Sequence, residues 1–340
     1  MRFWSRRRKN DFDADDGVGT LAVVIPVLNE EFNIAAAIRS ALGDENGGES
    51  GSSERQTRSA KNHRPMVVVV DGGSADATVA EARRAGADRV LRCATRGRGA
   101  QLACGVAAVC GAVGGGRNDA SSSSSSSSDS SFLPPPRTSR SRSRSRKRPP
   151  DTLLFLHADS CLPKGYRGSI SRALLSNPSS PSSWGAFETV YPTGLHPATS
   201  LFLAACVALR TRCLGLPYGD QGIFVKSDVL EKIGGVRRDL PLMEDVELVE
   251  RLSLAGKKQQ QQKKKKKKKS SSSSSSSNSD KNGREINSRP AVARGAVSTS
   301  GRRWAERGLL KTTALNLWTL ARWKGGWASA EELAREYYRR

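Results

Sequence analysis

Short apolar runs that end abruptly in polar residues recur along this chain. Most of them are rich in Val, Ile or Leu and show no polar alternation, which is typical of strands buried on both faces. The runs predict strands at residues 21–27, 67–70, 89–91, 153–156 and 223–225.

Helical patterns lie between these runs. Apolar positions recur with helical spacing after the first run, and further helices are expected at 75–86, 97–113 and from Glu244 to about Ala255. Alternating strands and helices predict an α/β fold with a mostly parallel, doubly wound sheet. Ligands bind such sheets beyond the carboxyl ends of the strands. Three predicted strands end in polar groups, so those ends should line one crevice.

Low-complexity segments interrupt the pattern. Poly-Ser and poly-Lys cannot bury enough apolar surface to fold, and surface loops tolerate insertions because loop-closure entropy grows slowly with length. We therefore expect one domain from residue 20 to 338, after a disordered N-terminal tail at 1–19. Disordered insertions are expected at about 43–65, 114–150 and 257–289.

The formal net charge of +23 is concentrated in two of these segments. Residues 137–148 and 257–269 carry seven and nine basic residues and no acidic ones. Blocks of like charge usually stay solvated and bind nucleic acid or acidic surfaces without specificity. We therefore expect no specific nucleic-acid partner for the folded remainder.

The cysteines and the N-terminus favour a cytoplasmic protein. The six cysteines form no CxxC pair, and residues 1–16 lack the apolar segment of a secretory signal. The most apolar stretch, 201–209, is shorter than the ~20 residues of a transmembrane helix. We expect no transmembrane helix there but a buried helix, with a helix lying on a membrane surface as the alternative.

Two strand ends carry carboxylates. Asp159, in His-Ala-Asp, is well placed to hold a hard divalent cation against a phosphate, although Asp is also a common cap of a helix or turn. Asp71 precedes two glycines that allow close approach of a ligand, so it is a candidate for binding a nucleobase or ribose. The alternative for Asp71 is a plain strand end with Ser74 as a helix cap.

Basic residues suited to phosphate appear in two further motifs. Arg98, in RGRGAQ, begins a predicted helix, where the helix N-terminus and the guanidinium suit a diphosphate. Arg302, Arg303 and Trp304, in SGRRW, could clamp phosphate and pack a sugar or base. The alternatives are a solvated basic turn and a basic helix start with a core tryptophan.

Glu244 and Asp245 begin a predicted amphipathic helix. Acidic residues are common at helix starts because they complement the helix dipole. A catalytic role requires one carboxylate to face the crevice, where it could take a proton from a hydroxyl nucleophile.

The motifs VIPVLNE, DGGSADAT, RGRGAQ, LFLHADS, GDQGIFV, PLMEDVE and SGRRW occur in this order. Their order closely resembles the family 2 glycosyltransferases with a GT-A fold, and most of all the small bacterial-type subgroup with HAD, GDQ and SGRRW motifs. The likeness runs from Leu21 to Trp304, and on toward Tyr338, outside the insertions. It implies transfer of a sugar from a nucleotide-diphosphate sugar to an acceptor hydroxyl, with Mn²⁺ or Mg²⁺ on the diphosphate and usually with inversion.

The resemblance also implies roles for residues. Asp245 would be the catalytic base, with Glu244 beside it, and Asp159 would bind the metal. The residues implied to bind the nucleotide sugar are Pro26, Asn29, Glu30, Asp71, Arg98, Asp220, Gln221, Arg302, Arg303 and Trp304. His157 departs from the family pattern, which has an aspartate there; histidine ligates Mn²⁺ but suits Mg²⁺ poorly. His157 could instead donate a hydrogen bond to a phosphate or a ribose.

Two other functions compete with this hypothesis. A nucleotidyltransferase usually has a Gly-rich loop with a lysine after its first strand, where this chain has Leu28-Asn29-Glu30. A non-catalytic RNA-binding protein would use the Arg-Ser and Lys runs, but no aromatic RNA-binding motif accompanies them. The basic runs and the apolar stretch 201–209 leave room for a lipid or a small-molecule acceptor and for peripheral membrane contact.

Overall fold

The computed structural model describes residues 18–43, 64–111, 148–177, 181–270 and 285–338. Most of the expected N-terminal tail and parts of all three expected insertions lie outside these residues. The described end of the tail packs against the sheet. Val18 is buried, and its carbonyl oxygen accepts hydrogen bonds from Thr152 Oγ1 and Lys226 Nζ.

The described residues form an α/β fold around a mixed eight-stranded sheet with the order β3-β2-β1-β4-β7-β6-β8-β5. Four of its seven pairings are parallel and three are antiparallel. The strands are β1 (Leu21–Val27), β2 (Met66–Asp71), β3 (Arg89–Arg92), β4 (Thr152–Phe155), β5 (Ser160–Cys161), β6 (Trp184–Thr193), β7 (Ile223–Lys226) and β8 (Ala291–Ser300). The predicted strands are confirmed, with ends shifted by at most one residue.

Helices cover both faces of the parallel half of this sheet. Val23 and Ile25 of β1 pack into the core cluster that also holds residues of α1 (Ile34–Leu42) and α5 (Tyr166–Leu174). Val24, between them, packs into the cluster that holds residues of α4 (Arg98–Cys110), α7 (Ser227–Lys232) and α8 (Glu244–Ser270). Burial on both faces explains why the strand sequences show no polar alternation. Helix α3 (Thr78–Arg84) packs beside α1.

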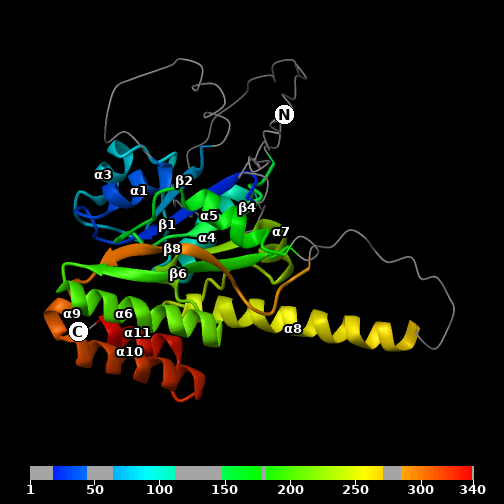
Figure 1. Cartoon of the computed structure of the whole chain (residues 1–340). Coiled ribbons are helices and arrows are strands. Elements are labelled where there is room, and N and C mark those ends of the chain that lie inside the picture. The colour runs from blue at the N-terminus through cyan, green and yellow to red at the C-terminus, as the bar shows by residue number, and fades with distance from the viewer. Residues whose placement is uncertain (1–17, 44–63, 112–147, 178–180, 271–284, 339–340) are drawn as a thin grey trace, which may run out of the picture.

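The remaining helices lie on the other side of the sheet from α1 and α3 (Figure 1). They are α6 (Pro197–Leu209), α9 (Arg302–Arg307), α10 (Leu309–Lys324) and α11 (Ala330–Tyr338). A π-helical turn, Arg210–Leu214, continues α6, and a short 3₁₀ turn, Gly219–Gln221, precedes β7. Leu333 and Ala334 of α11 form a small separate core with Leu242.

The expectation that 201–209 forms a buried helix is wrong. Helix α6 forms as predicted, but Leu201, Phe202 and Leu209 are 62%, 60% and 65% exposed. The helix lies along β6 as an outer layer, and within α6 only Ser200 and Leu203 are buried. The stretch 197–214 is long and apolar enough to cross a membrane by length and composition alone, a test that core helices of soluble proteins also pass.

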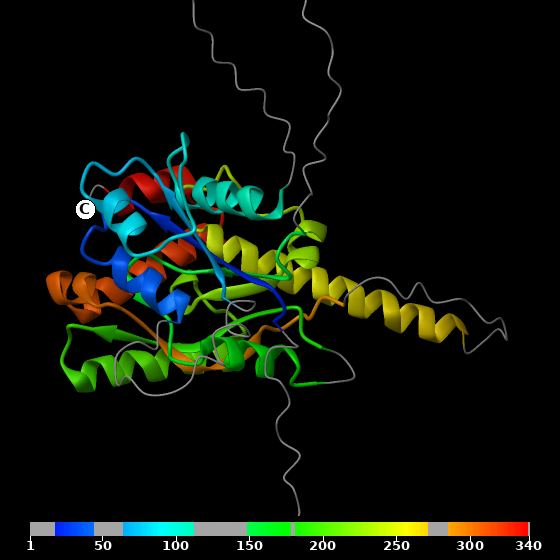
Figure 2. The ribbon, with the colours of Figure 1, turned by 90° about the horizontal axis from the view of Figure 1, so that it is seen from above.

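The expected end of the helix that begins at Glu244 is also wrong. Helix α8 does not stop near Ala255 but continues through the lysine run to Ser270. Lys and Gln are good helix formers, so the run can extend a helix that is already nucleated by its packed first turns. Helix α8, drawn in yellow, projects beyond the rest of the described molecule in both overall views (Figures 1 and 2).

The topology brings the polar segments to one edge of the sheet. Strands β1, β2 and β4 are parallel, so their carboxyl ends meet there. Because β7 is antiparallel to β4, with Phe155 paired to Ile223, the residues just before β7 meet those just after β4. Strand β6 runs antiparallel to β7, and β8 runs parallel to β6, so Ser300 at the end of β8 arrives at the same edge.

Candidate functional site

A cavity of about 190 Å³ lies at this edge. Eight of the predicted site residues line it, and they come from five separate motifs: Arg98, His157, Asp159, Asp220, Asp245, Arg302, Arg303 and Trp304. The structure therefore brings together side chains that lie more than two hundred residues apart in the chain.

Asp245 is fixed against the turn that precedes β7. Its Oδ2 accepts a hydrogen bond from the backbone N–H of Gly219 at 2.7 Å. A Cβ atom at position 219 would lie 2.7 Å from His157 Nε2 and 3.0 Å from Asp245 Oδ2. Only glycine lets this backbone approach both side chains so closely. Asp245 and His157 therefore both lie against one backbone position.

Burial and neighbouring charges shift two pKa values in the cavity. Burial, reinforced by Arg98, lowers the pKa of His157 to about 4, against the opposing effects of Asp159 and Asp245. Burial also raises the pKa of Asp220 to about 6, and the nearby carboxylates of Asp245 and Asp159 add to this rise. His157 is therefore neutral at neutral pH, with one ring nitrogen able to accept a hydrogen bond or ligate a metal.

Glu244 points away from the cavity. Its side chain is 1% exposed and forms an ion pair with Arg98, whose Nε lies 2.8 Å from Glu244 Oε1. Burial raises the pKa of Glu244 to about 7, while Arg98 opposes the shift. Arg98 lines the cavity and Glu244 does not, so Glu244 is placed to position Arg98 rather than to contact a substrate.

Gln221 is likewise turned into the protein. It is fully buried, and its Nε2 donates to the carbonyl of Phe187 at 2.9 Å and to Thr211 Oγ1 at 2.8 Å. Its Oε1 accepts from Arg210 Nη2 at 2.7 Å and from the backbone N–H of Tyr218 at 3.1 Å. These contacts hold the 3₁₀ turn against β6 and the π-helical turn.

A second group of predicted residues gathers at the ends of β1 and β2. Asp71 is buried, and its two oxygens accept hydrogen bonds from the backbone N–H groups of Gly73 and Ser74, which fixes the turn after β2. Asn29 reaches the same turn, since its Oδ1 accepts from the backbone N–H of Ala75 at 2.9 Å. Pro26 is buried inside β1. These residues do not line the cavity.

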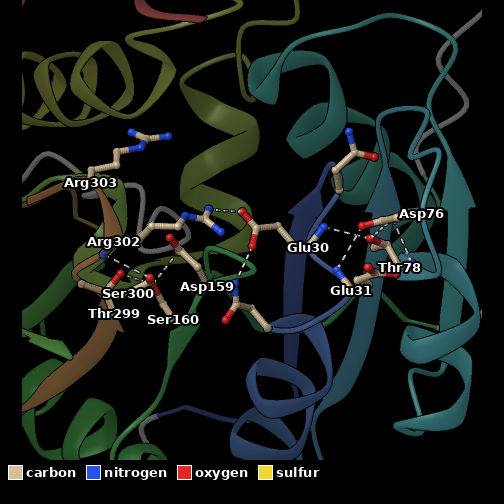
Figure 3. Close-up of polar contacts among 12 residues, drawn as sticks. Glu30, Glu31, Asp76, Thr78, Asp159, Ser160, Thr299, Ser300, Arg302 and Arg303 are labelled. Carbon is tan, nitrogen blue, oxygen red and sulfur yellow. Dashed lines mark hydrogen bonds and ion pairs between the residues drawn. The ribbon is translucent and has the colours of Figure 1, made fainter. Parts of the chain in front are cut away.

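An ion pair links the two groups. Arg302 Nη2 lies 3.2 Å from Glu30 Oε1, which joins the loop after β1 to the start of α9. Figure 3 shows this guanidinium directed toward Glu30, with Asp159 close beside it. Ser160, next to Asp159, donates to Thr299 Oγ1 at 3.0 Å, so β5 and the end of β8 are held together below the pair.

Arg303 and Trp304 complete the cavity wall. The Arg303 guanidinium lies over the Tyr337 ring, 4.8 Å from its centroid, and also hydrogen bonds to the Tyr337 hydroxyl. Trp304 Nε1 and Asp220 Oδ1 are buried and have no hydrogen-bond partner among the described residues. Buried polar atoms of this kind, facing a cavity, are free to meet a polar ligand.

Sequence reasoning missed several residues of the cavity. Tyr218, Thr312, Asn316, Thr319 and Tyr337 line it, mostly from the C-terminal helices. Those helices carry no motif, so no signal pointed to them. Met243, also in the wall, has a positive φ of 66°. It shares this feature with Asn29, and within the described residues no other non-glycine residue has a positive φ. Strained backbone of this kind concentrates at functional sites.

The donor set fits a divalent cation only in part. Asp159 and Asp220 supply carboxylate oxygens to the cavity, and Asp220 Oδ1 lacks a partner. The described residues contain no group of three His, Cys, Asp or Glu side chains arranged to hold a metal. Mg²⁺ is commonly held by one or two carboxylates together with substrate phosphates. Asp159 and Asp220, with neutral His157 as a nitrogen donor, are therefore the residues that would hold a metal brought by a diphosphate.

No family model and no curated protein matches this chain. Among solved structures, it is similar to glucosyl-3-phosphoglycerate synthase from Mycobacterium tuberculosis in complex with Mg²⁺ and UDP, at 16% identity and a TM-score of 0.40 over 86% of this chain and 75% of that one. The same synthase in complex with Mn²⁺, UDP and glucosyl-3-phosphoglycerate gives 16% identity and a TM-score of 0.41, over 91% and 83%. S. aureus TarS gives 13% identity and a TM-score of 0.40, over 68% and 33%. Likeness at this level carries no substrate or activity over to this chain.

Proposed function

We propose that this chain is a glycosyltransferase that moves a sugar from a nucleotide-diphosphate sugar to an acceptor hydroxyl. The observation that carries the proposal is the convergence of one set of chemical groups in a single cavity. Three carboxylates, a neutral histidine and three arginines meet there from motifs whose order resembles that of family 2 glycosyltransferases.

The charges of the cavity suit a diphosphate leaving group. Arg98, Arg302 and Arg303 line one cavity with Asp159, so arginines and a metal-binding carboxylate are available to the same phosphates. Guanidinium groups bind phosphate oxygens with two parallel hydrogen bonds, and they stabilise charge that develops on a departing group. A bound Mn²⁺ or Mg²⁺ would add Lewis-acid neutralisation of the diphosphate.

The proposed reaction is an in-line displacement at the anomeric carbon. The acceptor oxygen forms a bond to that carbon, while the bond from the carbon to the diphosphate oxygen breaks. Asp245 takes the proton of the acceptor hydroxyl. Hydrogen bonds from the backbone N–H groups of Gly219 to Oδ2 and of Val246 to Oδ1 orient this carboxylate, and each oxygen keeps a second lone pair for the acceptor. This reaction inverts the configuration at the anomeric carbon.

The nucleotide would extend toward β1 and β2. The cavity of about 190 Å³ is smaller than the roughly 300–1,000 Å³ of typical ligand sites, so a whole nucleotide sugar would reach beyond it. The Glu30–Arg302 ion pair links the cavity to the loop after β1. Beyond this pair, Asn29 and Asp71 lie at the ends of β1 and β2. We assign the base and ribose to this region, where the Asp71 carboxylate has lone pairs besides those that hold the turn.

A screen of nucleotide sugars in the presence of Mn²⁺ or Mg²⁺ tests the proposal. Wild-type protein should release a free nucleoside diphosphate, and its identity names the base. Asp159→Ala and Asp245→Asn should each reduce turnover by at least about a hundredfold. Asp228→Asn, which alters an exposed carboxylate on α7, serves as the matched control and should leave turnover unchanged.

Two outcomes would contradict the proposal. Release of pyrophosphate from a nucleoside triphosphate and a sugar 1-phosphate would identify a nucleotidyltransferase instead. Full turnover by a correctly folded Asp245→Asn variant would remove Asp245 from the role of base.

A further inference from the structure

Helix α10 is amphipathic, but its polar side faces the cavity and its apolar side faces outward. Its polar residues Thr312, Asn316 and Thr319 face the cavity. Its outward stripe is apolar and exposed, with Leu310, Leu317 and Trp318 recurring at helical spacing. An ordinary surface helix turns its polar residues to solvent, so this arrangement calls for a partner on the outer side.

Helix α6 shows the same feature. Leu201, Phe202 and Leu209 form an exposed apolar stripe along its outer side, and Leu214 in the following turn is exposed as well. Both helices lie on the side of the sheet away from α1 and α3 (Figure 1). We call the exposed apolar residues of this side the outer face: Leu201, Phe202, Leu209, Leu214, Leu310, Leu317, Trp318 and Trp327.

Basic residues outnumber acidic ones around the outer face, with seven basic and four acidic residues at 301–338. Residues 189–219, which contain α6, include two arginines, and residues 307–330, which contain α10, include four basic residues, with no acidic residue in either range. Three of these cations form ion pairs with carboxylates outside the two ranges: Arg212 with Glu188, Arg322 with Glu336 and Lys324 with Glu250. Lys311 is exposed on α10. Trp318 packs near Trp327, with ring centroids 6.4 Å apart, close in sequence to Lys324. Exposed tryptophans and leucines among basic residues are typical of surfaces that bind anionic bilayers.

Helix α6 is tied down along the sheet. Ser200 Oγ donates to the carbonyl of Pro192 at 2.7 Å, and Thr189 Oγ1 donates to the carbonyl of Ala204 at 2.5 Å. These bonds join the first turn and the middle of α6 to β6, so the helix presents its side to the surroundings. This geometry suits a helix that lies in a membrane interface and not one that crosses the bilayer.

We propose that the outer face binds the surface of an anionic lipid bilayer. The exposed side chains of α6 and α10 enter the boundary between headgroups and acyl chains, and the basic residues remain among the headgroups. A second copy of the chain fits less well, because a twofold interface pairs the same face with itself and would bring two surfaces with an excess of basic residues together. This inference does not depend on the proposed sugar transfer.

Vesicle co-sedimentation tests it. The vesicles are phosphatidylcholine mixed with phosphatidylserine, and the salt concentration is about 0.5 M, which screens binding by the lysine and arginine runs. Wild-type protein should sediment with the vesicles. The double variant Leu317→Glu/Trp318→Glu should bind at least about tenfold more weakly, since each buried apolar side chain contributes that much or more. Leu254→Glu, which alters an exposed leucine on α8, is the matched control and should bind like wild type.

Phe202→Glu on α6 provides a second, independent variant in case the α10 variant fails to fold, and it should also weaken binding. Three results would overturn the proposal: wild-type protein that does not sediment, folded variants of both helices that bind as well as wild type, or a wild-type dimer that the same variants convert to a monomer without any vesicle binding.

Discussion

Glu244 and Asp245 are neighbours in the chain but face different surroundings. Asp245 lines the cavity, whereas Glu244 is enclosed and paired with Arg98. The raised pKa of Glu244, about 7, means that the folded protein holds this proton more tightly than the unfolded chain. Between the usual glutamate value and about 7, the folded state binds more protons, so this residue's contribution to stability decreases as the pH rises.

Glu244→Gln should therefore stabilise the protein relative to wild type more at pH 8 than at pH 5. The change in the difference in unfolding free energy should be on the order of 2 kcal/mol, because glutamine mimics the protonated acid and cannot ionise. Denaturant unfolding of both proteins at the two pH values measures it. A difference that does not vary with pH would show that Glu244 stays ionised throughout, held by Arg98.

At this scale the sequence predicted which motifs reach the cavity better than it predicted which way their side chains point. Asp159, Asp245 and Arg98 follow strand ends or helix starts, and topology alone carries such positions to one edge of the sheet. Glu244 and Gln221 belong to the same motifs but turn inward, because direction depends on the packing of the surrounding elements. Local sequence does not encode that packing.

The 3₁₀ turn before β7 is held by two side chains, Gln221 within it and Asp245 of α8. Gln221 joins it to the carbonyl of Phe187, the hydroxyl of Thr211 and the side chain of Arg210. Because Gly219 in this turn touches both His157 and Asp245, the turn also positions the cavity groups.

Gln221→Ala should lower the unfolding free energy by about 2–4 kcal/mol, since it leaves several buried polar groups without partners. Gln260→Ala, at an exposed glutamine with one hydrogen bond to Ser288, should change stability by less than about 0.5 kcal/mol. Thermal or denaturant unfolding compares the two. If Gln221→Ala instead kept its stability and raised only the KM for a nucleotide sugar, the donor-binding role implied by the sequence would be correct.

The two wrong expectations about helices have physical causes. The apolar composition of α6 predicted core residues, but it does not tell which way a side chain faces. In the structure Leu201, Phe202 and Leu209 face outward. The lysine run was expected to be disordered because it cannot form a core. A helix that starts from packed turns at Leu248 and Leu252 can nonetheless extend into solvent without one.

For the molecule as a whole, the remaining question is whether the basic runs belong to its function. From Lys257 to Lys265 the side chains of α8 are mostly exposed, so this part of the helix adds little to the core. Residue 285 lies close to α8, since Lys263 Nζ lies 2.7 Å from Glu285 Oε2. A short Gly-Ser linker can therefore replace residues 264–284 without straining either end.

This deletion should leave the unfolding free energy within about 0.5 kcal/mol of wild type, because it removes no buried contact of the described core. Sugar transfer should persist, while affinity for a polyanion such as heparin and its dependence on salt should both decrease. A matched variant that changes only the six lysines at 264–269 to glutamine keeps the length and separates charge from length. Loss of transfer in both variants, with the fold intact, would instead assign the lysine run a direct part in function and favour the nucleic-acid-binding alternative.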